Sequence, residues 1–144
     1  MCLYSKEYGA SCAKEPIKCY KVLRRYDEND SVFYYSPYYG DRAIDSLTIK
    51  GELPYCALGK VTVVENKIGL NDGNFKVTKG FIHTYKDFFA AELIAWPEDS
   101  YSIFECEIPV GTEYYEGVDD SGRPNYASEC IIFKKIVKGY VPVD

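Results

Sequence analysis

The segment from Tyr101 to Ile108, YSIFECEI, shows the clearest alternation of apolar and polar residues in the chain. Successive side chains of a β-strand point to opposite faces of a sheet, so the residues with even numbers share one face and those with odd numbers share the other. The face that carries Phe104 and Cys106 is the more apolar, and we expect it to face the core. The segment therefore predicts a half-buried strand.

The segments on either side of this strand carry similar patterns, separated by turn signals such as Asn71–Asn74 (NDGN) and Pro109–Gly111. In the segment Ile17–Arg24 (IKCYKVLR), alternation places Lys21 on the same face as two apolar residues, Cys19 and Leu23. The strands that we predict are Ile17–Arg24, Val32–Tyr35, Ile44–Leu53, Lys60–Glu65, Phe75–Thr78, Gly80–His83, Tyr101–Ile108, Glu113–Glu116 and Ala127–Val137.

One segment, 84–96 (TYKDFFAAELIAW), has the pattern of a helix. Thr84 can cap its start, and Pro97 would end it. Its larger apolar residues recur at helical spacing and predict one apolar face. Because strands outnumber helices, we expect an α+β fold with a mostly antiparallel sheet and one main helix at about 84–96, in a single domain over 1–144 whose residues 1–15 form an irregular arm. The residues of the predicted apolar face are Tyr85, Phe88, Phe89, Leu93 and Trp96.

The charge balance bears on the kind of partner. The net charge is −5, and the basic residues are scattered along the chain. A protein that binds nucleic acid through phosphates needs a basic face, so we expect no nucleic-acid partner. An acidic surface suits a basic protein partner, or serves solubility alone.

The six cysteines and the single histidine bear on compartment and metal binding. The polar N-terminus MCLYSKEYGA does not have the pattern of a signal peptide, and no apolar run reaches the roughly 18 residues that a membrane span needs. Cys106 and Cys130 lie in apolar strand patterns, where a free thiol behaves as a small hydrophobe. No CxxC pair is present, and a zinc site would need dispersed ligands. We therefore expect reduced thiols, no metal, no membrane contact and a cytoplasmic protein.

Tyrosines are unusually frequent, at 15 of 144 residues, and the densest group lies at 34–39. Neighbouring residues of a strand point to opposite faces, so not every ring of this group can face the core. Exposed tyrosines beside Pro37 and Gly40 are typical of a binding loop, whereas packing at a sheet edge is the structural alternative. The candidate partner-binding residues are Tyr34, Tyr35, Tyr38 and Tyr39.

Candidate catalytic residues are few. His83 follows an apolar strand and precedes the predicted helix, where a side chain can lie near free backbone amides, although a histidine there can equally serve structure by bonding a carbonyl. Acidic residues cluster between Glu105 and Asp120, and paired carboxylates can act as acid and base, but a solvated surface is the more common reason for such a cluster. The glycines form neither a dinucleotide-binding nor a P-loop pattern.

Three segments resemble known proteins: CYKVL at 19–23, KGFIHTYKDFFAA at 79–91, and the stretch 105–133, which contains IPVGT and YASECIIF. Together they resemble a group of small uncharacterised proteins of phages and gut bacteria, and they are distantly similar to ADP-ribosyltransferase-like domains. The second resemblance implies an enzyme that uses NAD. It would assign Glu129 to orienting the nicotinamide ribose or activating the acceptor, His83 or Tyr85 to holding NAD, and Tyr20 to stacking on it.

Three functions follow as expectations. The first is a non-enzymatic binding protein of phage type, which would inhibit a host defence protein or sequester a small signal in the host cytoplasm and need no cofactor. The second is the NAD-dependent transferase just described. The third is an accessory module that assembles with copies of itself, for example as a homodimer through tyrosine-bearing strands.

Overall fold

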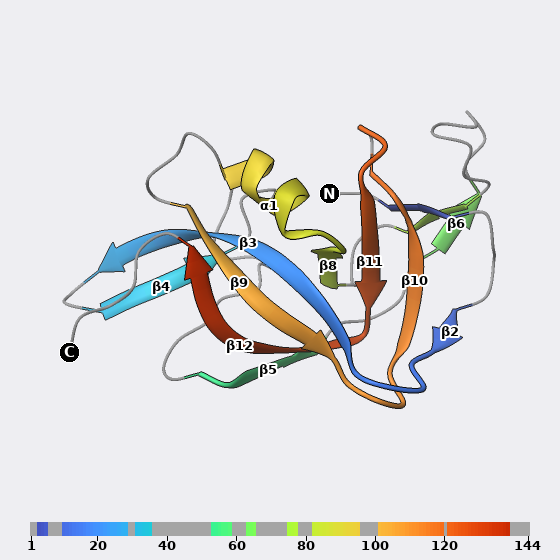
Figure 1. Ribbon diagram of the computed structural model, residues 1–144, viewed down its shortest axis with the longest axis horizontal. Coiled ribbons are helices and arrows are strands. Elements are labelled where there is room, and N and C mark those ends of the chain that lie inside the picture. The colour runs from blue at the N-terminus through green and yellow to red at the C-terminus, as the bar shows by residue number, and fades with distance from the viewer. Residues whose placement is uncertain are drawn as a thin grey trace.

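Two long antiparallel strands, β3 (Ile17–Glu28) and β9 (Tyr101–Ile108), lie near the middle of the sheet in the computed structural model (Figure 1). Strand β9 has the predicted bounds, and its core face is confirmed, because Phe104 and Cys106 are buried. Strand β3 starts where expected but continues to Glu28, beyond the predicted end at Arg24. The structure describes residues 3–5, 10–28, 31–35, 53–58, 63–65, 75–77, 82–95, 101–119 and 121–138.

The strands form one sheet in which every described pairing is antiparallel. Along the sheet the order is β5-β12-β9-β3-β8-β11-β10-β1-β7-β6, while β2 pairs with β10 and β4 pairs with β3. The fold is therefore mainly β with one short helix, which agrees with the expected antiparallel sheet. The remaining elements are β1 (Leu3–Ser5), β2 (Ser11–Cys12), β4 (Ser31–Tyr35), β5 (Tyr55–Leu58), β6 (Val63–Glu65), β7 (Phe75–Val77), β8 (Ile82–Tyr85), α1 (Phe88–Ala95), β10 (Glu113–Val118), β11 (Pro124–Ser128) and β12 (Cys130–Lys138).

Apolar side chains gather on both faces of the sheet. The largest cluster lies on the face of Phe104 and includes Phe133, whose ring meets that of Phe104 edge to face at a centroid distance of 5.4 Å. On the opposite face, Val22, Tyr85 and Ile103 pack under α1. A third cluster surrounds Leu3 of β1. The helix is thus a cover for one face of the sheet, beside the central strands.

The helix is shorter than predicted. Thr84 does not cap it, because Thr84 and Tyr85 belong to β8 and pair with Tyr126 and Asn125 of β11. These ladder bonds satisfy the backbone of 84–85 in the sheet, so the helix begins only at Phe88. Trp96 lies outside the described residues.

Two other segments differ from the sequence prediction. Residues 127–137 form parts of two strands rather than one, because the chain bends at Glu129 between β11 and β12. Residues 1–15 were expected to be an irregular arm, yet Leu3–Ser5 is a buried strand between β10 and β7. The backbone hydrogen bonds of β1 and the burial of Leu3 stabilise this strand although the residues around it in the sequence are polar. The predicted strand 44–53 lies almost entirely outside the described residues.

Candidate functional surface: helix α1 and the strands beneath it

Helix α1 turns two small residues inward and two large apolar residues outward. Ala90 and Ala91 are buried against the sheet, whereas the side chains of Phe89 and Leu93 are 67% and 47% exposed. The two exposed residues are four positions apart, so they lie on one side of the helix, one turn from each other. The apolar face predicted for this helix is therefore wrong at Phe89 and Leu93, and these two side chains form an outward apolar pair.

The position of α1 is fixed from both sides. Phe88 is half-buried, and its ring meets the ring of Tyr20 on β3 edge to face at 5.6 Å. Glu92 accepts a hydrogen bond of 2.6 Å from the ammonium of Lys138 at the end of β12. The outward pair of Phe89 and Leu93 is thus carried by a helix that is held to β3 through a ring and to β12 through an ion pair.

The residues assigned to NAD chemistry lie mostly in the core. His83 and Tyr85 are buried in β8, and Tyr85 packs under α1. Tyr20 is directly opposite Tyr85 in the pairing of β3 with β8, and Phe88 lies against its ring. Glu129 is half-buried in the bend between β11 and β12. Three of the four residues therefore come from neighbouring strands on one side of the sheet, and α1 covers the place where Tyr20 and Tyr85 meet.

A lysine occupies the core on the other face of the sheet. Lys21 is only 6% exposed, and its ammonium donates a hydrogen bond of 2.7 Å to the carbonyl oxygen of His83. Burial lowers the pKa of Lys21 to about 8, while the thiols of Cys106 and Cys19 act in the opposite direction. The alternation of residues 17–24 predicts that Lys21 lies on the same face as apolar residues, so the burial of Lys21 could be expected from the sequence.

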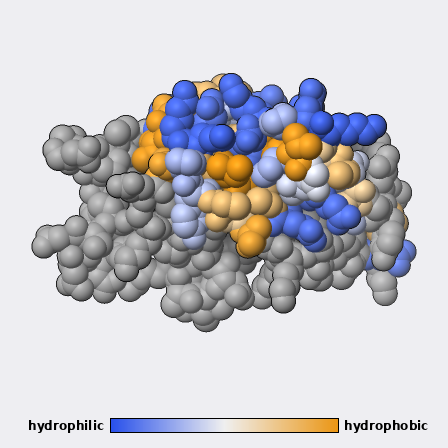
Figure 2. Space-filling view, turned by 90° about the horizontal axis from the view of Figure 1, so that it is seen from below, coloured by the Kyte–Doolittle hydropathy of each residue, from blue (hydrophilic) through white to orange (hydrophobic). Residues whose placement is uncertain are grey.

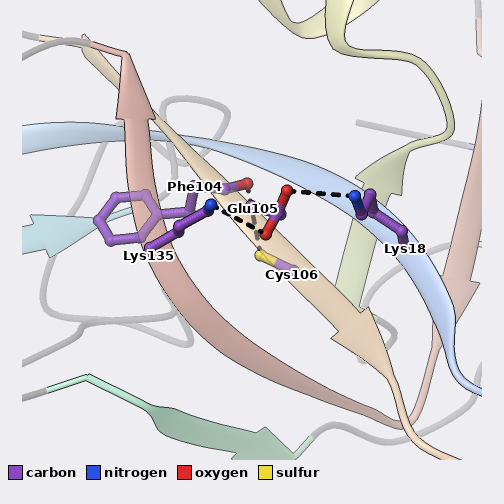
Figure 3. Close-up of polar contacts among 5 residues, drawn as sticks. All are labelled: Lys18, Phe104, Glu105, Cys106 and Lys135. Carbon is purple, nitrogen blue, oxygen red and sulfur yellow. Dashed lines mark hydrogen bonds and ion pairs between the residues drawn. The ribbon is translucent and has the colours of Figure 1, made fainter.

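The surface of the central strands carries a ladder of ion pairs. Glu105 of β9 lies between Lys18 of β3 and Lys135 of β12, with Oε1 at 3.5 Å from one ammonium and Oε2 at 3.8 Å from the other (Figure 3). Glu107 pairs with Lys134 in the same way, at 3.7 Å. These carboxylates have partners on neighbouring strands, which supports a structural reading of the acidic cluster over acid–base chemistry.

Asp119, also in the acidic cluster, organises a turn. Its Oδ1 accepts hydrogen bonds of 2.9 Å from the backbone N–H groups of Ser121 and Arg123. Gly122 follows with a φ of 78°, a backbone conformation that favours glycine. Asp119 is buried in this turn between β10 and β11, and this position accounts for it without a catalytic role.

The predicted tyrosine patch is placed only in part. Tyr34 and Tyr35 belong to β4, where their backbones pair with Arg25 and Arg24 of β3. Their side chains, together with Tyr38 and Tyr39, lie outside the described residues. The role of these four tyrosines therefore stays a prediction.

The surface on the side of the molecule away from α1 differs from the outward face of α1 in how its hydrophobic residues are distributed. Figure 2 shows that hydrophobic and hydrophilic residues are interspersed over the described part of that side. The exposed apolar residues that do not belong to α1 include Leu58 of β5 and Val110, which are 80% and 59% exposed. Leu58 is the last residue of β5, whereas Val110 lies in the turn between β9 and β10. Only on α1 does one short element carry two of the large exposed apolar side chains found among the described residues.

Comparison with known proteins yields no relative: no family model, no curated protein and no solved structure matches this chain. In the described part of the chain, no three His, Cys, Asp or Glu side chains are grouped so that they could hold a metal ion. Among the same residues, no helix has the length and apolar character needed to cross a membrane.

The outward pair on α1 was missed because helical periodicity gives the angular position of a residue but not which side faces the sheet. The two small residues Ala90 and Ala91 indicate which side of the helix faces the sheet. Two adjacent small residues let a helix backbone approach a sheet closely, so they favour an inward position over the bulkier Phe89 and Leu93.

Proposed function

We propose that this chain is a non-enzymatic protein-binding module that contacts its partner through the outward face of α1. The observation that carries the proposal is the orientation of the helix, with Ala90 and Ala91 inward and Phe89 and Leu93 outward. The inward alanines account for the close approach of the helix to the sheet, but they do not require large apolar residues on the outward face, where polar residues are usual. An aromatic and an aliphatic side chain presented together on a fixed helix are suited to insertion in a pocket of another protein.

The charge of the chain indicates the character of this partner. With a net charge of −5, the protein favours a partner whose surface is basic around an apolar pocket. Phe89 and Leu93 would fill the pocket. The four tyrosines of 34–39 are a second contact in this proposal. The resemblance to phage proteins suggests the specific form of an inhibitor of a host defence protein.

The experiment compares the capture of a partner by matched variants. The double substitution Phe89→Ser with Leu93→Ser should weaken binding by about 2 kcal/mol or more, as expected for the loss of central apolar anchors. The control is Leu58→Ser with Val110→Ser, which removes two exposed apolar side chains elsewhere and should leave binding unchanged. Affinity for the captured partner is measured by calorimetry with each purified variant.

Two outcomes would contradict the proposal. One is equal binding by both double variants, which would move the contact away from α1. The other is association of the chain with itself, seen by size-exclusion chromatography with light scattering and abolished by the Phe89 and Leu93 substitutions. That result would favour the self-assembling module instead.

The NAD-dependent alternative has less support. His83 and Tyr85 are buried, and Phe88 of α1 covers Tyr20, so NAD could reach these residues only if the helix moved. Incubation with labelled NAD tests it directly. Transfer or hydrolysis that is lost in the Glu129→Gln variant would establish the enzyme and displace the binding proposal.

A further inference from the structure

Two cysteines meet at the surface where β5 pairs with β12. Cys56 is exposed, Cys130 is half-buried, and their sulfur atoms are 3.4 Å apart. In the register of the two strands, Cys56 lies opposite Ile132 and Cys130 lies opposite Leu58, so the two thiols are diagonal neighbours. A disulfide requires an S–S distance of about 2.05 Å, so the two sulfur atoms would have to approach each other by roughly 1.4 Å.

The chain contains a second cross-strand pair that serves as an internal contrast. Cys19 of β3 and Cys106 of β9 are directly opposite each other, but both are buried. Burial raises the pKa of Cys19 to about 12 and the pKa of Cys106 well above its ordinary value. The thiol of Cys106 is also directed to the carbonyl oxygen of Phe104, at 3.6 Å (Figure 3). A reagent in solution therefore reaches one of the two pairs and not the other.

We propose that Cys56 and Cys130 are a redox site that forms an intramolecular disulfide by exchange with a low-molecular-weight disulfide. The class of reagent is an oxidised thiol of the glutathione type. The product joins β5 to β12 by a covalent bond. Strand β5 is the last strand at its end of the described sheet, so the bond fixes that end of the sheet.

The exchange proceeds in two balanced steps. The thiolate of Cys56 attacks one sulfur of the reagent, breaks its S–S bond, and releases one equivalent of free thiol. The thiolate of Cys130 then attacks the sulfur of Cys56, forms the protein disulfide, and releases the second equivalent. The protein loses two electrons and two protons in total, and the reagent takes them up as two thiols.

Exposure and electrostatics give the order of the two steps. Cys56 is the more exposed thiol and meets the reagent first. The pKa of Cys130 is raised to about 11, by burial and then by the hydrogen bond and the charge of Cys56. Once Cys56 is in the mixed disulfide, its charge and its thiol proton are gone, so the pKa of Cys130 falls and its attack becomes easier.

The experiment treats the reduced, full-length protein with oxidised glutathione under native conditions, blocks remaining thiols with N-ethylmaleimide, and maps the peptides by mass spectrometry. We expect a peptide that contains Cys56 linked to one that contains Cys130, whereas Cys19 and Cys106 are blocked only after denaturation. The midpoint of thermal unfolding should rise by about 5–10 °C on oxidation, because the bond closes a long loop.

Single variants separate the steps. Cys130→Ser should accumulate a stable glutathione adduct on Cys56, and Cys56→Ser should form no disulfide at Cys130. The matched control is Cys12→Ser, since Cys12 is exposed and distant in the pairing from both residues, and this variant should keep the link. Circular dichroism confirms that each variant is folded. Recovery of Cys56 and Cys130 of the wild-type protein as blocked thiols, or a disulfide between two copies of the chain, would overturn the proposal.

Discussion

Lys21 shows how one residue can make stability depend on pH. Its ammonium is buried and donates a hydrogen bond to the carbonyl of His83, among the thiols of Cys19 and Cys106. The folded state binds this proton less tightly than the unfolded state, because burial lowers the pKa of Lys21 from 10.5 to about 8. Between pH 8 and 10.5 the unfolded chain therefore carries one more proton at this residue, so the contribution of Lys21 to stability rises with pH across this window. Below pH 8 the buried charge lowers the free energy of unfolding by roughly 3 kcal/mol.

Lys21→Met is the corresponding test, because methionine keeps the length of the side chain and removes its charge. At pH 7 we expect the free energy of unfolding to rise by about 1–3 kcal/mol. Measured by urea unfolding from pH 7 to 10, the difference between the variant and the wild type should shrink as pH rises. The subtraction cancels most of the titration of tyrosines and cysteines. A difference that is constant with pH would show that Lys21 keeps its proton in the folded state up to pH 10, so that its pKa is not lowered by burial.

Gly117 illustrates a constraint of space. A Cβ atom at this position of β10 would overlap the carbonyl oxygen of Tyr4 and lie 2.9 Å from Cδ2 of Leu3. Strand β1 can therefore pack against β10 at this position only if the residue is glycine. We expect Gly117→Ala to lower the free energy of unfolding by about 2–3 kcal/mol in a urea titration. Gly111→Ala is the control, since its Cβ has no atom within 4 Å but its φ is 86°, and it should cost only about 1 kcal/mol. Equal costs would show that crowding by β1 is not the cause.

At the scale of elements, the sequence predicted strands better than it predicted the helix. The strand 101–108 has the predicted bounds because alternation over eight residues is a strong local signal. The boundary between β8 and α1 was wrong because Thr84 is a good cap by itself, and only the distant strand β11 draws 84–85 into the sheet. The bend at Glu129 has the same origin: the two halves of 127–137 pair with different partners, β8 and β9.

Helix α1 offers two phenylalanines in adjacent positions with opposite environments. Phe88 packs on Tyr20, whereas Phe89 is 67% exposed. We expect Phe88→Ala to lower the free energy of unfolding by about 2–3 kcal/mol, somewhat less than for a fully buried ring. Phe89→Ala should change it by less than about 0.5 kcal/mol. Chemical denaturation measures both. A large loss of stability for Phe89→Ala would mean that its ring supports the fold, and it would remove the basis for the binding surface on α1.

At the scale of the whole molecule, the pairing of strands that are distant along the chain could not be predicted from the sequence. No local pattern says that β1 pairs with β7 and β10, which are at least 70 residues away. The same holds for the candidate sites. Tyr20, His83 and Tyr85, which the resemblance assigned to NAD binding, lie on the neighbouring strands β3 and β8. Helix α1 packs over Tyr20 and Tyr85, and the orientation of this helix depends on tertiary contacts that no local pattern encodes. The pair Cys56 and Cys130 is 74 residues apart, so only the register of β5 on β12 reveals it.

The position of β1 leads to a prediction about the whole sheet. Among the described strands, β1 is the link between β10 and the pair β7–β6, and Leu3 packs with Val77 of β7 and Tyr115 of β10. Leu3→Ala should therefore lower the free energy of unfolding by about 2–4 kcal/mol. In hydrogen exchange, the amides of β6 and β7 should lose protection first, while those of β3 and β9 keep it longer, because the central strands retain their partners. Lys14→Ala, at an exposed position outside β1, should alter neither quantity. If Leu3→Ala behaved like Lys14→Ala, then residues 3–5 would be an arm after all, and β6 and β7 would be held to the molecule by some other contact.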